Sequence, residues 1–304
     1  MTTLRYHRVD VFTDRPFGGN PLAVFVDADE LDRDTMQQVA REMNLSETVF
    51  CLKPTVADAE VRLRIFTVDR ELPLAGHPVV GTHFVLASTG RYTLNEGANV
   101  VRGQLEAGVL PVEVVVENGD VREVLMTQRT PAFAPACKDV DLVARALGLD
   151  RDCLCPADLP VRLVDTGVPW LIVPVRDLPA LRRVRPDFAA CAELAQRVGA
   201  ETFYAFTQDT EDADCAVRAR HVWFGRVTPG EDPVTGSAAG CLAAYLVHEG
   251  VLLAAPTAEV RIEQGAEVQR RGIVDAFVDV EAGKIKRVGV GGRAVHIGDG
   301  ELRI

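Results

Sequence analysis

The chain has 304 residues, of which 47% are hydrophobic and 25% are charged, and its net charge is −11. This composition is typical of a soluble protein that is long enough for two ordinary domains. The acidic balance argues against a nucleic-acid partner, which requires a basic face, and no apolar run approaches the ~18 residues of a membrane span.

Two further features bear on the compartment and on metals. The N-terminal sequence MTTLRYHRVDVF lacks the apolar segment of a secretory signal, which predicts a cytoplasmic protein. The seven cysteines are odd in number, which predicts free thiols in a reducing compartment. Only Cys153 and Cys155 are close in sequence, and a C-x-C pair alone is weak evidence for a metal site. No metal is therefore expected.

The first half of the chain predicts a strand, a helix, further strands and a second helix, in that order. Residues 22–28 (LAVFVDA) have the pattern of a strand, and residues 32–43 that of an amphipathic helix. One strand then follows Glu47-Thr48, and the next carries Arg64. The helix at 78–89 is apolar on nearly every side, which predicts that it is buried.

The second half repeats this order. A strand at 171–175 precedes a helix near 187–198, a strand that carries Arg220 and an apolar helix at 238–249. The two arginines are interpreted as ties between strands and acidic residues, not as site residues. Valine-rich strands close each half, and the sequence ENGD at 117–120 predicts a hairpin turn.

A six-residue motif precedes both apolar helices. Glu71 begins ELPLAG and Glu231 begins EDPVTG, 160 positions later, and both fit E-x-P-x-x-G. Other motifs recur in the same order, among them Glu47-Thr48 and Glu201-Thr202. An ordered series of this kind predicts an internal duplication. We therefore expect an α+β protein of two pseudo-twofold-related lobes, each a curved, mostly antiparallel sheet around a buried helix, with a cleft between them.

The helix starts at Gly76 and Gly236 predict an anion site. A helix N-terminus offers unpaired N–H groups and about half a positive charge, and glycine lets a ligand approach closely. A small carboxylate would fit there. The alternative is that A-G-H and T-G-S are ordinary helix caps, but the duplication of the motif favours a ligand.

Four longer segments carry a family resemblance. They read VDVFTDRPFGGNPLAVF, NLSETVF, RIFTVDRELPLAGHPVVGTHFVL and EDPVTGSAAGCLAAYL. Their succession resembles the signatures of the PhzF-like isomerases, the phenazine-biosynthesis family, which shares its fold with diaminopimelate epimerase and proline racemase. The resemblance extends from Val9 to the C-terminal GGRAVHIGDGEL, which is nearly the whole chain.

The resemblance implies an isomerase that needs no cofactor, is usually a homodimer, and moves a proton between carbons of a small carboxylated substrate. Trans-2,3-dihydro-3-hydroxyanthranilate is one candidate substrate. The fold relatives imply that the C-terminal strand crosses back to the first lobe. The implied lobes are residues 1–118 with 292–304, and residues 119–291.

The resemblance also implies a set of site residues. The acid/base is Glu47, supported by His77 and Asp232, and the carboxylate contacts are Ser46, Gly76, Gly236 and Ser237. The epimerase relatives use a thiol at each helix start, but here those places hold His77 and Ser237, and Cys241 lies about one turn later. One carboxylic acid that gives and takes a proton on the same face suits an isomerisation, and burial would raise its pKa towards neutrality.

Other interpretations of these residues stay open. Glu47 is alternatively a solvated acid between a helix and a strand, because Glu201 occupies the equivalent place. Asp232 is alternatively a helix cap, and His77 a packed core histidine. The alternative functions are an amino-acid epimerase or racemase on the same fold, or a non-catalytic anion-binding homodimer. In each case the expected partner is a small anion, not nucleic acid or a membrane.

Overall fold

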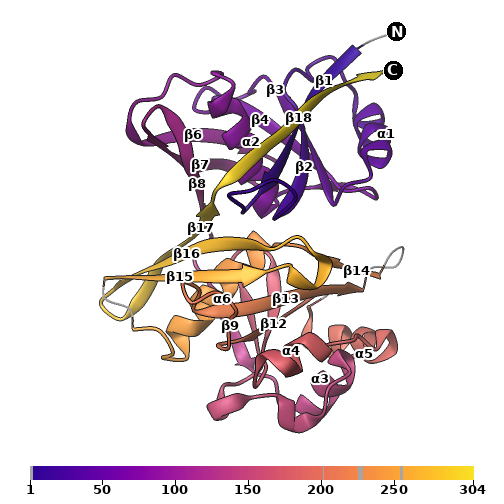
Figure 1. Ribbon diagram of the computed structural model, residues 1–304, viewed down its shortest axis with the longest axis vertical. Coiled ribbons are helices and arrows are strands. Elements are labelled where there is room, and N and C mark those ends of the chain that lie inside the picture. Colours follow the sequence, from indigo (N-terminus) through magenta and orange to yellow (C-terminus); the bar gives the residue numbers. More distant parts are fainter. Residues whose placement is uncertain (1–2, 201, 225–228, 254–255) are drawn as a thin grey trace. The chain divides into compact units, whose positions relative to one another are not determined.

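The computed structural model describes residues 3–200, 202–224, 229–253 and 256–304, and it divides into two compact units (Figure 1). The first unit holds Met1–Thr127 with Gly291–Ile304, and the second holds Gln128–Val290. The predicted lobes divide at 118/119, in the turn of a hairpin, whereas the compact units divide at 127/128, near the end of the hairpin's second strand.

The first unit is a long sheet with one helix on each face. Its strands are β1 (Thr3–Val11), β2 (Asn20–Phe25), β3 (Glu47–Leu52), β4 (Val61–Phe66), β5 (Glu71–Leu72), β6 (Gly97–Leu105), β7 (Gly108–Glu117), β8 (Asp120–Gln128) and β18 (Ala294–Arg303), and its helices are α1 (Arg33–Met43) and α2 (Gly76–Ser88).

Helix α2 is enclosed by this sheet. The strand order is β18-β1-β2-β3-β4-β6-β7-β8, in which β2–β3 and β4–β6 are parallel and the other neighbours are antiparallel. α2 contacts β18 and β1 near one end of this order and β7 near the other, so the sheet curves around it (Figure 1). Every residue of α2 from Gly76 to Leu86 is buried. α1 covers the outer face through Met36 and Val39.

The second unit contains more helix. Its strands are β9 (Ala132–Ala136), β10 (Arg162–Asp165), β11 (Pro169–Pro174), β12 (Phe203–Thr207), β13 (Val217–Phe224), β14 (Pro229–Asp232), β15 (Thr257–Gln264), β16 (Gly272–Glu281) and β17 (Lys284–Gly292), its α-helices are α3 (Val140–Leu147), α4 (Leu178–Arg183), α5 (Phe188–Val198) and α6 (Gly236–His248), and its 3-10 helices are Arg151–Cys153, Pro156–Asp158 and Ala266–Val268.

The two units share one topology. The series β1-β2-β3-β4-β6-β7 and the series β10-β11-β12-β13-β15-β16 both alternate antiparallel and parallel neighbours in the same order. The short strands β5 and β14 pair with β4 and β13, and each leads to a buried helix. α6 contacts β10, β11, β15 and β16, while α3, α4 and α5 form a second core with β11 and β12. The predicted fold class, α+β with two lobes of like topology, is confirmed.

Each copy ties its E-x-P-x-x-G motif to the neighbouring strand by an ion pair. Arg64 donates from Nε and Nη2 to the two carboxylate oxygens of Glu71, at 2.7 and 2.8 Å. Arg220 donates in the same way to Glu231, at 2.8 and 2.7 Å. The predicted role of the two arginines is confirmed, and the pairs explain why glutamate begins both motifs.

Strand register corrects one predicted equivalence between the halves. The partner of the β4 arginine lies three residues after Glu47, whereas the partner of the β13 arginine lies four residues after Glu201. Glu47 therefore corresponds to Thr202 and not to Glu201, which lies outside the described residues. The letters of the two short E-T motifs match, but the structurally equivalent positions differ from this match by one residue.

The predicted hairpin turn at 117–120 agrees with the backbone angles. Asn118 and Gly119 both have positive φ, 56° and 84°, as a two-residue hairpin turn between right-handed twisted strands requires.

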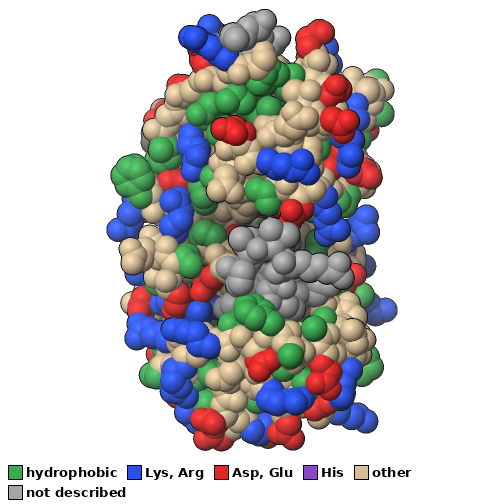
Figure 2. Space-filling view, turned by 90° about the vertical axis from the view of Figure 1, so that its right-hand side faces the viewer, with side chains coloured by type: hydrophobic (Ala, Val, Ile, Leu, Met, Phe, Trp, Pro, Cys, Tyr) green, Lys and Arg blue, Asp and Glu red, His purple; other side chains and the backbone are tan. Residues whose placement is uncertain are grey.

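Among the described residues, none of the helices is both long enough and apolar enough to span a membrane. Acidic and basic side chains are interspersed over the face shown in Figure 2.

Candidate active site

The first unit brings Glu47 and His77 together. Glu47 is the first residue of β3, and His77 is the second residue of α2. Glu47 Oε2 lies 3.3 Å from His77 Nε2, and the two side chains are only 16% and 7% exposed. A carboxylate and an imidazole at this separation, with little access to water, can hold and move a proton. The structure thus joins two of the three residues that were predicted to do the chemistry.

Ser46 lies next to this pair and bonds to the strand beside it. Its Oγ donates to Oδ1 of Asn20, a fully buried residue at the start of β2. Gly19, just before it, has φ +55° and passes so close to Val11 that a Cβ would lie 2.0 Å from the carbonyl oxygen of Val11. Glycine is required there, which accounts for the glycine that precedes Asn20 in the sequence.

The two buried helices begin without a side-chain cap. The N-caps of α2 and α6 are Ala75 and Thr235, and neither side chain bonds to the first turn. In contrast, aspartate caps the other four α-helices that the structure describes, at Asp32, Asp139, Asp177 and Asp187. The alternative that T-G-S is an ordinary helix cap does not fit Thr235, whose hydroxyl does not bond to the first turn of α6 and bonds elsewhere. Gly76 and Gly236 stand first in their helices and are buried.

In the second unit, Thr235 lies at the centre of a polar network. Its hydroxyl donates to Asp232 Oδ2 at 2.5 Å. Gln264 donates from Nε2 to the carbonyl oxygen of Asp232 (2.8 Å) and to Thr235 Oγ1 (3.1 Å). The amide oxygen of Gln264 accepts from Tyr204 Oη (2.8 Å) and from the backbone N–H of Thr235 (3.1 Å). This network holds Asp232 in one orientation.

His221 completes the network from β13. Its Nδ1 lies 3.2 Å from Thr235 Oγ1 and 3.8 Å from Asp232 Oδ2. Because the single hydroxyl proton of Thr235 already goes to Asp232, the hydrogen of this contact must sit on Nδ1. The ring packs edge-to-face on Trp170, with centroids 4.6 Å apart, and its Nε2 is buried without a hydrogen-bond partner among the described residues.

The first unit has apolar residues at the corresponding positions. His221 pairs with Asp232 across β13–β14, and Ile65 pairs with Leu72 across β4–β5. By the same register, Thr235 and Gln264 correspond to Ala75 and Leu105. The network therefore belongs to the second copy of the common fold and has no counterpart at these positions in the first. Sequence reasoning missed His221 and Gln264, although polar residues aligned against apolar ones in a duplicated chain would have revealed them.

Ser237 and Cys241 follow in α6. Ser237 is half-buried and corresponds to His77 in the first unit. Cys241 is fully buried, its Sγ lies 3.1 Å from Thr166 Oγ1, and burial raises its pKa to about 12. Such a thiol stays protonated near neutral pH and is unsuited to proton abstraction.

The chain is similar to known proteins over its whole length. The family model described as phenazine biosynthesis-like protein matches residues 9–300. An uncharacterised isomerase of Mesorhizobium japonicum is 36% identical, with 100% of both chains covered. The trans-2,3-dihydro-3-hydroxyanthranilate isomerase of Pseudomonas chlororaphis is 32% identical, with 98% of both chains covered.

Solved structures agree with these matches. A phenazine biosynthesis protein of the PhzF family from Bacillus anthracis superposes with a TM-score of 0.88 at 32% identity, over 100% of both chains. A probable proline racemase from Agrobacterium radiobacter, solved with bound carbonate, gives a TM-score of 0.68 at 14% identity, over 99% of this chain and 93% of the racemase. The second likeness concerns the fold alone.

Proposed function

Because the chain is an isomerase of the phenazine biosynthesis-like (PhzF) family, as its motifs predict, we propose that it moves a proton between two carbons of a small carboxylated substrate without a cofactor. The observation that carries the proposal is the half-buried Glu47, 3.3 Å from His77 at the uncapped start of α2. The name of the relative from Pseudomonas chlororaphis makes trans-2,3-dihydro-3-hydroxyanthranilate the first substrate to test.

Glu47 is the proposed shuttle. As a carboxylate it takes a proton from one substrate carbon while the C–H electron pair forms a new double bond. The electrons of the neighbouring double bond then take a proton from the resulting carboxylic acid at another carbon, and this acid exchanges its proton with water between the two steps. Atoms and electrons balance without an oxidant or a reductant. His77 positions the carboxylate of Glu47. We propose that the amides near Gly76, with Ser46, bind an anionic group of the substrate in the first unit, and that the amides near Gly236, with Ser237, can bind one in the second unit.

We propose that Asp232 supports the reaction, as the family resemblance implies. The orientation of its carboxylate depends on the network around Thr235. Replacing Thr235 by valine keeps the shape of the side chain but removes the hydrogen bond to Asp232 Oδ2. A hydrogen bond to a charged group contributes about 1.5–3 kcal/mol, so we expect kcat/KM to fall about tenfold to a hundredfold. Steady-state kinetics measure the loss, and Thr235→Ser, which restores the hydroxyl, should recover most of it. Equal activity of the two variants would contradict a role for the network.

Solvent deuterium incorporation tests the isomerase proposal. In deuterated water the enzyme should convert trans-2,3-dihydro-3-hydroxyanthranilate, or a related dihydroaromatic acid, and incorporate deuterium at the carbon that Glu47 reprotonates, as mass spectrometry and NMR can show. EDTA and thiol alkylation should leave this reaction in place, because the mechanism uses neither a metal nor a thiol. Loss of activity on alkylation would favour a two-thiol epimerase. Binding of the substrate without any incorporation of deuterium would favour a non-catalytic anion-binding protein.

A further inference from the structure

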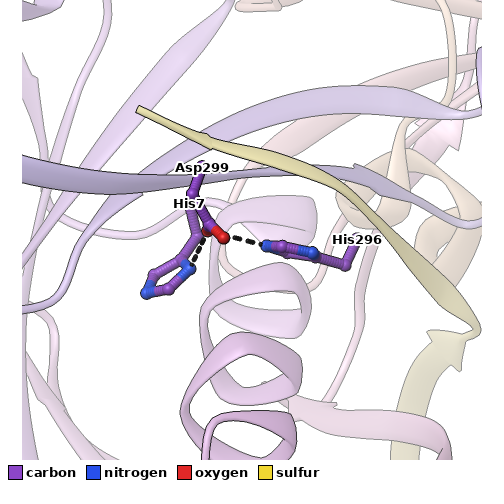
Figure 3. Close-up of side chains that lie close together, drawn as sticks. All are labelled: His7, His296 and Asp299. Atoms are coloured by element: carbon purple, nitrogen blue, oxygen red, sulfur yellow. Dashed lines mark hydrogen bonds and ion pairs between the residues drawn. The ribbon is translucent and has the colours of Figure 1, made fainter. Parts of the chain in front are cut away.

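A cluster of two histidines and an aspartate joins the first and last strands of the chain (Figure 3). His7 lies on β1, and His296 and Asp299 lie on β18, which pairs antiparallel with β1. The cluster belongs entirely to the first unit. Neither strand carries a residue of the proposed reaction, so the cluster is separate from the Glu47 site.

A β-bulge puts the three side chains on one face. His7 is paired directly with Asp299, so these two residues share a face of the sheet. His296 is three residues from Asp299 and would project to the opposite face of a regular strand. The register shifts between Arg8 and Val9, so that His296 stands opposite Val9, two residues along β1 from His7. The extra residue of β18 therefore turns His296 to the side of its two partners.

The three side chains already converge on one point. His7 Nδ1 lies 2.6 Å from Asp299 Oδ1, and His296 Nε2 lies 3.0 Å from the same oxygen. One ligand atom from each residue lies within 4.8 Å of the other two. A tetrahedral ion with bonds of about 2.0–2.2 Å separates its ligand atoms by roughly 3.3–3.6 Å. Rearrangements of less than about an ångström would fit these atoms around such an ion.

We propose that His7, His296 and Asp299 form a binding site for a divalent late transition metal of the Zn²⁺ class. Two imidazoles with one carboxylate suit Zn²⁺, Ni²⁺ or Cu²⁺ and disfavour Mg²⁺ and Ca²⁺, which prefer oxygen. The side chains of His296 and Asp299 are 40% and 64% exposed, so a fourth position opens to solvent and the ion exchanges readily. A metal there links β1 to the strand that ends the chain.

The test is a titration of the full chain, freed of metal with EDTA, by ZnCl₂ in a calorimeter, with CoCl₂ as the spectroscopic probe. We expect one ion per chain and cobalt d–d bands of a tetrahedral site. His296→Asn and Asp299→Asn should each weaken binding at least about tenfold, since each removes one of three ligands. Saturating Zn²⁺ should raise Tm by about 5 °C, because the ion binds the folded chain, and MgCl₂ should not.

His248→Asn is the matched control. Its side chain is 41% exposed, close to the 40% of His296, but it does not belong to the cluster. The control should bind Zn²⁺ as the wild type does. Equal affinity of His296→Asn and His248→Asn, or uptake that does not saturate at one ion per chain, would overturn the proposal. Circular dichroism of each variant shows that the fold is kept, and Asp299→Asn gives a second, independent test if His296→Asn unfolds.

Discussion

Glu47→Gln should lower kcat by about 10²–10⁴-fold while the protein keeps its fold and binds substrate within about tenfold of the wild type. Glutamine keeps the shape of the side chain and one hydrogen-bonding oxygen, but it cannot carry a proton between two carbons. Steady-state kinetics on the substrate identified by deuterium incorporation measure the loss, and calorimetric titration measures the binding. In deuterated water the variant should incorporate no label.

Glu71→Gln is the matched control for this substitution. Glu71 lies in the same unit, and its side chain is also 16% exposed, but its carboxylate is held by Arg64 at 2.7 Å. The hydrogen bond from Arg64 outweighs desolvation and lowers the pKa of Glu71, so the group is a fixed anion, not a proton carrier. We expect Glu71→Gln to lower stability and to keep kcat within a few-fold of the wild type. If both variants kept normal turnover, the single-carboxylate mechanism would have to be abandoned.

Much of the fold could be predicted from the sequence, because the duplicated elements carry a strong local signal. The buried helices are apolar all round, and the E-x-P-x-x-G motif has a physical reason to recur, since its glutamate pairs with a strand arginine in both units. The one-residue error at Glu201 arose because two short motifs can match by letter without sharing a strand register. Register is set by the pairing of whole strands and by bulges, which a short motif does not encode.

The polar network of the second unit could not be predicted from the sequence for a different reason. His221 and Gln264 are far from Asp232 and Thr235 in sequence, and only the pairing of β13 with β14 and β15 brings them together. Long-range pairing also creates the cluster of His7 with His296 and Asp299 from the two ends of the chain. Contacts of this kind follow from topology and not from local pattern.

The two copies of the arginine–glutamate ion pair also allow a prediction about stability, with a large expected effect. Arg220→Met should destabilise the protein by about 3–5 kcal/mol, because it leaves a carboxylate without its partner in a buried place. The Arg220 side chain is 4% exposed and that of Glu231 is 10% exposed. Arg220 also donates from Nη1 to the carbonyl oxygens of Leu181 at 2.8 Å and Arg182 at 3.3 Å, near the end of α4. Methionine fills the space and replaces none of these bonds.

Arg64→Met is the same change in the other copy, and it should cost only about 1–2 kcal/mol. Both side chains of that pair are 16% exposed, and Arg33 remains 3.2 Å from Glu71 as a second partner. Urea unfolding followed by circular dichroism compares the two variants. Tryptophan fluorescence isolates the second unit, since both tryptophans, Trp170 and Trp223, belong to it. The Arg220→Met/Glu231→Leu double variant should recover part of the loss, because no unpaired carboxylate is then left at Glu231. An equal loss of unfolding free energy in Arg220→Met and Arg64→Met would show that burial does not set the strength of this ion pair.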